Sequence, residues 1–177
     1  TYPSGGSFTG VGFQADLSWQ KPRNLADSNQ LVDSVRGVSE ILKSDTTGDE
    51  RTDVNFITSF DSDGFTMGSN DWETSVTVVA WNWLGANGTV TNTDGTNIDS
   101  TVSANTTAGF SICTYTGTGT NADSFGHGLT EKPQLVIIKA RDLTNNWLVG
   151  ATDVYGTSSG EEGYQIINLV NAVNHSN

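Results

Sequence analysis

The residues with the clearest chemical potential are two aspartates in a short acidic turn. Asp61 and Asp63 lie in the sequence Asp-Ser-Asp-Gly, between the apolar runs 56–60 and 65–68. Two carboxylates beside a glycine suit a hard cation, so they form a candidate Ca²⁺ site. The spacing departs from that of helix-loop-helix calcium loops. A β-hairpin turn whose aspartates accept backbone N–H groups explains the same residues, and we favour that interpretation.

Five tryptophans invite a sugar-binding interpretation, because a flat aromatic face can stack on the C–H surface of a sugar. Trp19, Trp81 and Trp83 fall within strand-like patterns, where packing in the core is the default. Trp72 lies in a polar stretch, which makes it the best candidate among the five for an exposed aromatic anchor, although packing remains the favoured interpretation. Trp147 lies at the junction of a loop and a strand. Trp72 and Trp147 are therefore the candidate ligand-binding residues.

The sequence offers no arrangement typical of catalysis. His127 sits between two glycines, His175 is distant from it, and neither has Cys or Glu at zinc-ligand spacing. Nucleophile-elbow and phosphate-binding glycine motifs are missing. Acidic pairs like those of glycoside hydrolases arise by chance among 20 acidic residues. We predict a protein that is not an enzyme, with no catalytic residues and no cofactor other than the Ca²⁺ considered above.

Composition limits the partners. The 177 residues hold 8 Lys and Arg against 20 Asp and Glu, which gives a net charge of −12. Such a surface repels phosphate backbones, so we expect no nucleic-acid partner. Apolar runs such as 135–138 are far too short for a transmembrane helix, so we expect no membrane insertion.

The elements that must position these residues are short strands. Twenty glycines and many Thr, Ser, Asn and Asp residues disfavour helices and favour turns. Strands are expected at 17–21, 30–33, 39–43, 56–60, 65–68, 76–84, 135–139, 147–150 and 164–169. The strand at 135–139 is apolar on both faces, which predicts a central, covered position. The fold class is all-β, an antiparallel β-sandwich or jelly roll.

An internal repeat organises these strands. At one constant separation along the chain, several residues of residues 10–25 recur in residues 128–143. The pairs are Gly10 with Gly128, Val11 with Leu129, Leu17 with Leu135, Lys21 with Lys139, Arg23 with Arg141 and Leu25 with Leu143. With small gaps, Leu31-Val32 falls on Leu148-Val149 and Ile41-Leu42 on Ile166-Ile167. We interpret this order as a duplication.

The repeat sets the predicted domain boundaries. Residues 1–86 form a first β-sandwich repeat that starts in mid-strand, 87–107 form a Gly/Asn/Thr-rich linker, and 108–177 form a second, incomplete repeat. The second repeat has no counterpart of residues 56–84. Either the sequence is a fragment of a longer chain, or a neighbour supplies the missing strands.

Several stretches together resemble a repeated domain of structural proteins of tailed bacteriophages, especially marine and cyanobacterial phages. They are Phe13 to Arg23, Asp33 to Gly37, Thr58 to Ser69, Val79 to Trp83, Ala108 to Gly119 and Gly126 to Leu129. The resemblance covers nearly the whole chain. Two positions depart from it, because Ala15 replaces the usual Pro and Asn82 the usual Cys.

The resemblance implies a lectin-like, concanavalin-like β-sandwich and a non-catalytic role in the virion. We expect a tail-fibre or surface module for assembly and adhesion, made in the host cytoplasm and exposed on the particle. The expected partners are other virion proteins, further copies in a homo-oligomer, and a host surface glycan. The alternative is a capsid decoration or assembly protein without a receptor. A glycan-degrading module is a third, less favoured hypothesis.

Overall fold

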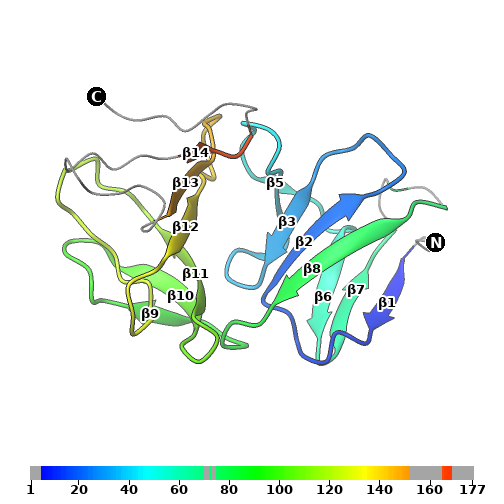
Figure 1. Ribbon diagram of the computed structural model, residues 1–177, viewed down its shortest axis with the longest axis horizontal. Helices are drawn as coiled ribbons and strands as arrows, with labels where there is room; N and C mark the ends of the chain where they lie inside the picture. Colours follow the sequence, from blue (N-terminus) through cyan, green and yellow to red (C-terminus); the bar gives the residue numbers. More distant parts are fainter. Residues whose placement is uncertain (1–4, 70–71, 73–74, 152–164, 169–177) are drawn as a thin grey trace.

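The computed structural model describes residues 5–69, 72, 75–151 and 165–168, and its elements are all strands, β1 to β14 (Figure 1). The prediction of an all-β chain is therefore confirmed for these residues. Every strand pair is antiparallel, and a single parallel bridge joins Asn97 to Ser124 among the described residues. Within the same residues, no helix is long and apolar enough to cross a bilayer.

Two sheets built from residues 6–83 face one another, and we call them the N-terminal sheet pair. The larger has the order β5 (Arg51–Thr52), β4 (Gly37–Leu42), β3 (Gln30–Asp33), β2 (Leu17–Pro22), β8 (Val78–Trp83). The smaller has the order β1 (Gly6–Thr9), β7 (Gly64–Met67), β6 (Ile57–Asp61). The predicted strands at 17–21, 30–33, 39–43, 56–60, 65–68 and 76–84 all have counterparts here.

The core of the chain lies between these two sheets. Val32 and Ile41 of the larger sheet pack with a buried cluster from the facing segments. That cluster consists of Phe56, Ile57, Phe65, Met67, Trp72 and Val76. Two layers that share one apolar interior are consistent with the predicted β-sandwich.

Two further sheets lie together on the other side of the molecule (Figure 1). The middle sheet has the order β11 (Phe110–Tyr115), β10 (Ser100–Asn105), β9 (Val90–Asn92). The C-terminal sheet has the order β12 (Leu135–Ile138), β13 (Leu148–Ala151), β14 (Gln165–Ile166). The segment 87–107, predicted as a linker, thus holds β9 and β10. The strand β10 was missed because its sequence is mostly small and polar, although Val102 and Ser103 are buried.

Asp16 joins the middle sheet to the N-terminal sheet pair. Its carboxylate is buried and accepts hydrogen bonds from Gly85 N at 2.7 Å, Asn87 N at 3.1 Å, Ser34 Oγ at 2.6 Å and Ser103 Oγ at 3.3 Å. A β-carbon on Gly85 would lie 2.6 Å from Ser103 Oγ, so glycine is required there. A buried carboxylate is tolerated because its lone pairs are occupied in this way.

A second junction is ionic. Glu50, in the loop between β4 and β5, accepts hydrogen bonds from Arg36 Nη1 at 2.8 Å and Arg141 Nη2 at 2.6 Å. Arg36 is almost fully buried and also pairs with Asp33. Burial disfavours the ionised Glu50, but the hydrogen bonds from Arg141 and Arg36 and their charges outweigh it and lower the pKa of this carboxyl. Residues on either side of the molecule are thereby tied by charge.

Candidate functional site

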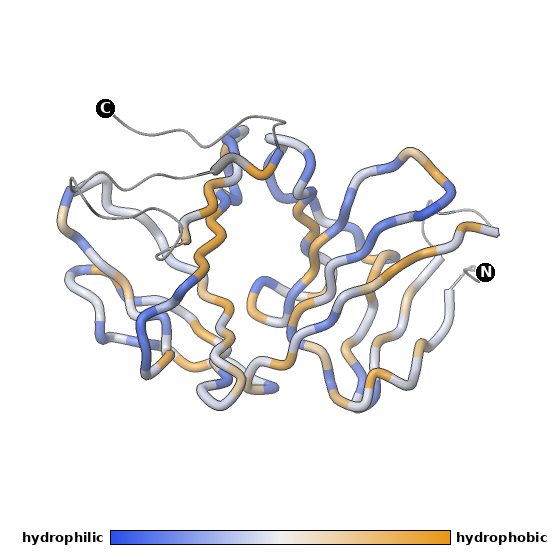
Figure 2. Tube along the Cα trace, in the orientation of Figure 1, coloured by the Kyte–Doolittle hydropathy of each residue, from blue (hydrophilic) through white to orange (hydrophobic). Residues whose placement is uncertain are grey.

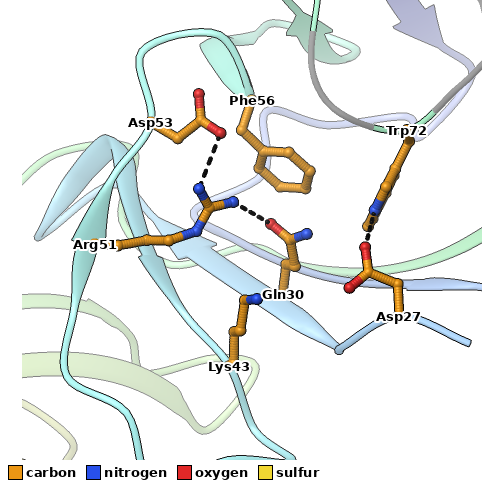
Figure 3. A pocket seen from close by; sticks show the side chains of 7 residues that line it. All are labelled: Asp27, Gln30, Lys43, Arg51, Asp53, Phe56 and Trp72. Atoms are coloured by element: carbon orange, nitrogen blue, oxygen red, sulfur yellow. Dashed lines mark hydrogen bonds and ion pairs between the residues drawn. The ribbon is translucent and has the colours of Figure 1, made fainter.

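A small polar pocket opens on the N-terminal sheet pair and has a volume of about 200 Å³ (Figure 3). It is lined by Asp27, Gln30, Lys43, Arg51, Asp53, Phe56 and Trp72. These residues come from the ends of β3, β4 and β5 and from the loops beside them. Residues distant in the sequence therefore meet because the strand ends of one sheet lie side by side.

The carboxylate of Asp27 forms one wall with the indole of Trp72. Trp72 Nε1 donates to Asp27 Oδ2 at 2.7 Å, and Ser28 N donates to Asp27 Oδ1 at 2.7 Å. Burial opposes the charge of Asp27, but these two hydrogen bonds, with Lys43 and Lys21 nearby, outweigh it and lower the pKa of the carboxyl. Asp27 is thus an anion at neutral pH and does not hold the proton that a general acid must give.

Arg51 organises the opposite wall. Its Nη1 lies 3.3 Å from Asp53 Oδ2, and its Nη2 donates to Gln30 Oε1 at 3.5 Å (Figure 3). The ammonium-bearing Lys43 lines the same pocket. Asp27, Gln30 and two nitrogens of Arg51 are already engaged by neighbours, so what the pocket offers a ligand is mainly the ammonium of Lys43 and the remaining N–H groups of Arg51.

This arrangement suits recognition of a small polar molecule. Charged groups from separate strands surround two ring walls, Phe56 and Trp72, whose centroids lie 5.1 Å apart at 89°. Ligand pockets for drug-sized molecules usually span about 300–1,000 Å³, so this one admits a single sugar unit or a similar group. Hydroxyl or carboxylate oxygens of such a ligand would accept from the two cations.

The two aspartates of the predicted calcium site have different partners. Asp63 accepts from Gly10 N at 3.0 Å and Gly12 N at 2.6 Å, and these bonds lower the pKa of its carboxyl. Asp61 accepts from Ser59 Oγ at 2.8 Å and Thr66 Oγ1 at 2.7 Å.

The backbone explains why this turn holds its place. Asp61 pairs with Gly64 in the β6–β7 register, as the hairpin interpretation predicts. Gly64 has a φ of 147°, and a β-carbon there would lie 1.9 Å from Phe8 O, so the turn requires glycine. No group of three or more His, Cys, Asp or Glu side chains suited to a metal occurs among the residues that the structure describes. The geometry therefore favours the hairpin over a Ca²⁺ site.

Trp72 is buried, with 3% of its surface exposed, so the candidate exposed anchor at this position is wrong. The polar neighbours in the sequence misled that inference, because the indole turns inward onto Phe56 and Asp27. It lines the pocket nonetheless. Ligand binding by Trp72 stays a prediction, now as a wall of this pocket.

Trp147 is also buried and fixes the C-terminal sheet to the larger N-terminal sheet. It packs on Leu31 and Leu42, and its Nε1 donates to Lys43 O at 2.9 Å. We call this contact, together with the Glu50–Arg141 ion pair, the clasp. A buried indole in the clasp presents no face to a ligand, so its position favours a structural role.

The exposed tryptophan is Trp81, which the strand pattern assigned to the core. Val78 and Ala80 of β8 pack on the core, but Trp81 points to the other face of the sheet and is 48% exposed. It meets Trp19 edge to face, with ring centroids 6.2 Å apart. Alternation along a strand separates its two faces, but it does not show which face a second sheet covers.

The C-terminal sheet carries the most exposed apolar strand of the described residues. Leu135, Val136, Ile137 and Ile138 of β12 are 59%, 37%, 42% and 38% exposed, and Figure 2 shows this unbroken hydrophobic run. Leu148 of β13 is 40% exposed. The prediction that β12 is central and covered is wrong for these residues, because it lies at the sheet edge.

Comparison with known proteins gives one match. A family model described as a domain of unknown function, DUF7483, matches residues 3–175. No curated protein and no solved structure matches the chain.

Proposed function

Since the chain belongs to the DUF7483 family, a domain of unknown function, we propose its role from its own residues. The protein is a non-catalytic structural component of a bacteriophage virion, a tail-fibre or surface module for assembly and host adhesion. It is made in the host cytoplasm and exposed on the particle, where it contacts other virion proteins and further copies of itself.

The observation that carries this proposal is the exposed apolar strand β12, which lies at the edge of the C-terminal sheet among the described residues. An edge strand with four exposed aliphatic side chains is a liability in a free monomer, and such surfaces mark contacts with other chains. In an assembly, neighbouring chains would cover the exposed side chains of β12. The phage assignment itself rests on the sequence resemblance.

The matching register of two hairpins supports the same proposal, because a duplication would produce it. The β2–β3 hairpin pairs Leu17 with Asp33, and the β12–β13 hairpin pairs Leu135 with Ala151. The two residues of the second pair therefore follow those of the first at the same distance along the sequence. In each sheet the next strand, β4 or β14, then pairs antiparallel on the far side. This register aligns Leu31 with Val149, one residue away from Leu148, with which the sequence comparison had matched it. We propose two related units on a concanavalin-like plan.

Adhesion has two candidate surfaces. The pocket provides Lys43 and Arg51 for the oxygens of a sugar, and the exposed face of Trp81 provides a platform for its C–H surface. A host surface glycan would use one or both. The alternative function, capsid decoration without a receptor, is favoured by the same exposed β12 if that strand packs against the shell.

Location in the particle tests the structural proposal. Antibodies against the chain, applied to intact phage particles that encode it, should label tail fibres or another surface structure in electron micrographs. Label on the capsid shell supports the decoration alternative. Particles that lack the protein altogether contradict both.

A glycan array tests adhesion. The wild-type chain is compared with Lys43→Ala in the pocket, Trp81→Ala on the open face, and Val90→Ala, an exposed apolar control in β9. We expect binding that survives in the control and is lost in one of the other two, which identifies the surface. Wild-type protein that binds no glycan contradicts adhesion.

A further inference from the structure

The outer edge of β12 corresponds to the edge of β2 that pairs with β8 in the larger N-terminal sheet. In the larger N-terminal sheet, β2 pairs with β3 on one side and with β8 on the other. In the C-terminal sheet, β12 pairs with β13 on one side, and no strand of the described residues pairs with its other side. Its unpaired N–H and C=O groups form a template for one more strand.

Nothing in β12 protects that edge. Natural edge strands are blunted by a charge, a proline or a bulge, and Leu135 to Ile138 contain none of these. By contrast, β2 alternates half-buried and buried residues and keeps Ser18 and Gln20 on its buried face. A strand that is apolar on both sides is typical of one with neighbours on both edges and layers on both faces.

The internal comparison also indicates what kind of strand is missing. β8 is apolar on both of its faces, since Val78 and Ala80 face the core while Val79 and Trp81 face the other way. It pairs with β2 over six residues, from Leu17 opposite Trp83 to Pro22 opposite Val78. A strand of this pattern would satisfy the backbone of β12 and bury part of its side chains.

We propose that β12 accepts a β8-type strand from another copy of this domain. The added strand runs antiparallel to β12, with Leu135 opposite the residue equivalent to Trp83 and Ile137 opposite the equivalent of Trp81. This inference rests on the duplication and the assembly role proposed above. It adds to them the edge, the partner segment and the register.

Charge favours such a partner at this place. Lys132 and Lys139 flank β12 at its two ends, next to the acidic Glu131 and close to Asp142, while Arg141 is already paired with Glu50. Another copy carries a net charge of −12, so its approach is opposed less at this edge than by the acidic chain as a whole.

The test is strand addition in trans to the full chain. A fluorescent peptide with the sequence of residues 76–84 and terminal lysines for solubility is titrated with the protein, and anisotropy reports binding. We expect saturable binding and slowed amide exchange at Leu135 to Ile138. A peptide of the same composition in scrambled order is the peptide control.

Two protein variants make the result specific. Ile137→Lys places a charge where the added strand would cover it and should weaken binding by about tenfold or more. Val54→Lys, at an exposed valine outside β12, should leave binding unchanged, and circular dichroism checks that both variants fold. A peptide that does not bind, or binds Ile137→Lys as well as wild type, overturns the proposal.

Self-pairing is the competing arrangement. If the chain dimerises through β12 against β12, sedimentation shows a dimer that Ile137→Lys dissociates, and the peptide does not compete. That outcome also overturns β8-type donation. The virion role is tested separately by antibody labelling, and it fails if the phage particles lack the protein.

Discussion

The larger N-terminal sheet and the C-terminal sheet contain hairpins of the same register but opposite burial. β3 is buried along its whole length, whereas all four residues of β12 are exposed, although β12 is the more apolar strand. The difference lies in what covers them. β6 and β7 lie over the first sheet and β8 pairs with the outer side of β2, while the described residues provide neither a covering sheet nor an outer strand for β12.

The comparison teaches that burial is a property of layers. Ser18 and Gln20 are fully buried in β2 because a second sheet lies above them, and they hydrogen bond to each other at 3.2 Å. Ile137 is 42% exposed because nothing described lies above it. From side-chain hydrophobicity alone, Ile137 would be expected to be more buried than Ser18 and Gln20.

The largest expected effect comes from truncating one isoleucine in each sheet. Ile41→Ala in β4 removes a fully buried side chain and should lower the free energy of unfolding by about 2–5 kcal/mol. Ile137→Ala in β12 should lower it by less than about 1 kcal/mol in the isolated chain. Urea denaturation measures both. Equal losses would show that β12 is covered after all.

A smaller effect is expected from the ion pair of the clasp. Glu50→Gln weakens the hydrogen bonds to Arg36 and Arg141 and should cost about 2 kcal/mol at neutral pH. Asp49→Asn changes the net charge equally without removing these contacts and is the control.

Lowering the pH should abolish the difference in stability between the wild-type protein and Glu50→Gln. The pKa of Glu50 is lower in the folded protein than in the unfolded chain, so its contribution is complete above the ordinary carboxyl pKa. It is lost as the pH falls through the lowered folded-state value. Urea titrations at decreasing pH should therefore show wild type and Glu50→Gln converging. A gap that widens in acid would contradict the assignment.

The smallest effect is expected from the indole hydrogen bond of the clasp. Trp147→Phe keeps an aromatic ring on Leu31 and Leu42 but leaves Lys43 O with only the long hydrogen bond from Thr46 N at 3.4 Å, at a cost of about 1 kcal/mol. Trp81→Phe, on the open face of β8, should change stability by less than about 0.5 kcal/mol. Thermal unfolding of the pair measures the difference. If Trp81→Phe is the costlier change, the assignment of the two faces is wrong.

Much of the strand order was predictable, because local alternation and turn chemistry specify it. Asp61 to Gly64 predicted the β6–β7 hairpin, and the β3 boundaries Gln30 and Asp33 were found as expected. These features depend on residues close in the sequence.

The errors concern contacts between distant segments. Trp72 was the candidate for the outside and Trp81 was placed inside, and both assignments were reversed by the position of the second sheet. The pocket escaped notice because Lys43, Arg51 and Asp27 show no spacing in the sequence that indicates a shared site. The predicted strand at 164–169 is represented by β14, while its residues 164 and 169 lie outside the described residues.

The clasp has a mechanical consequence. It ties residues 43–50 to residues 141–147, so tension applied to the two ends of the described chain passes from one segment to the other directly. Strands β9 to β11 pair only with one another among the described strands, so they are shielded from load until the clasp ruptures. Single-molecule pulling should show that rupture before β9 to β11 unravel, and traces in which those strands extend first would contradict it.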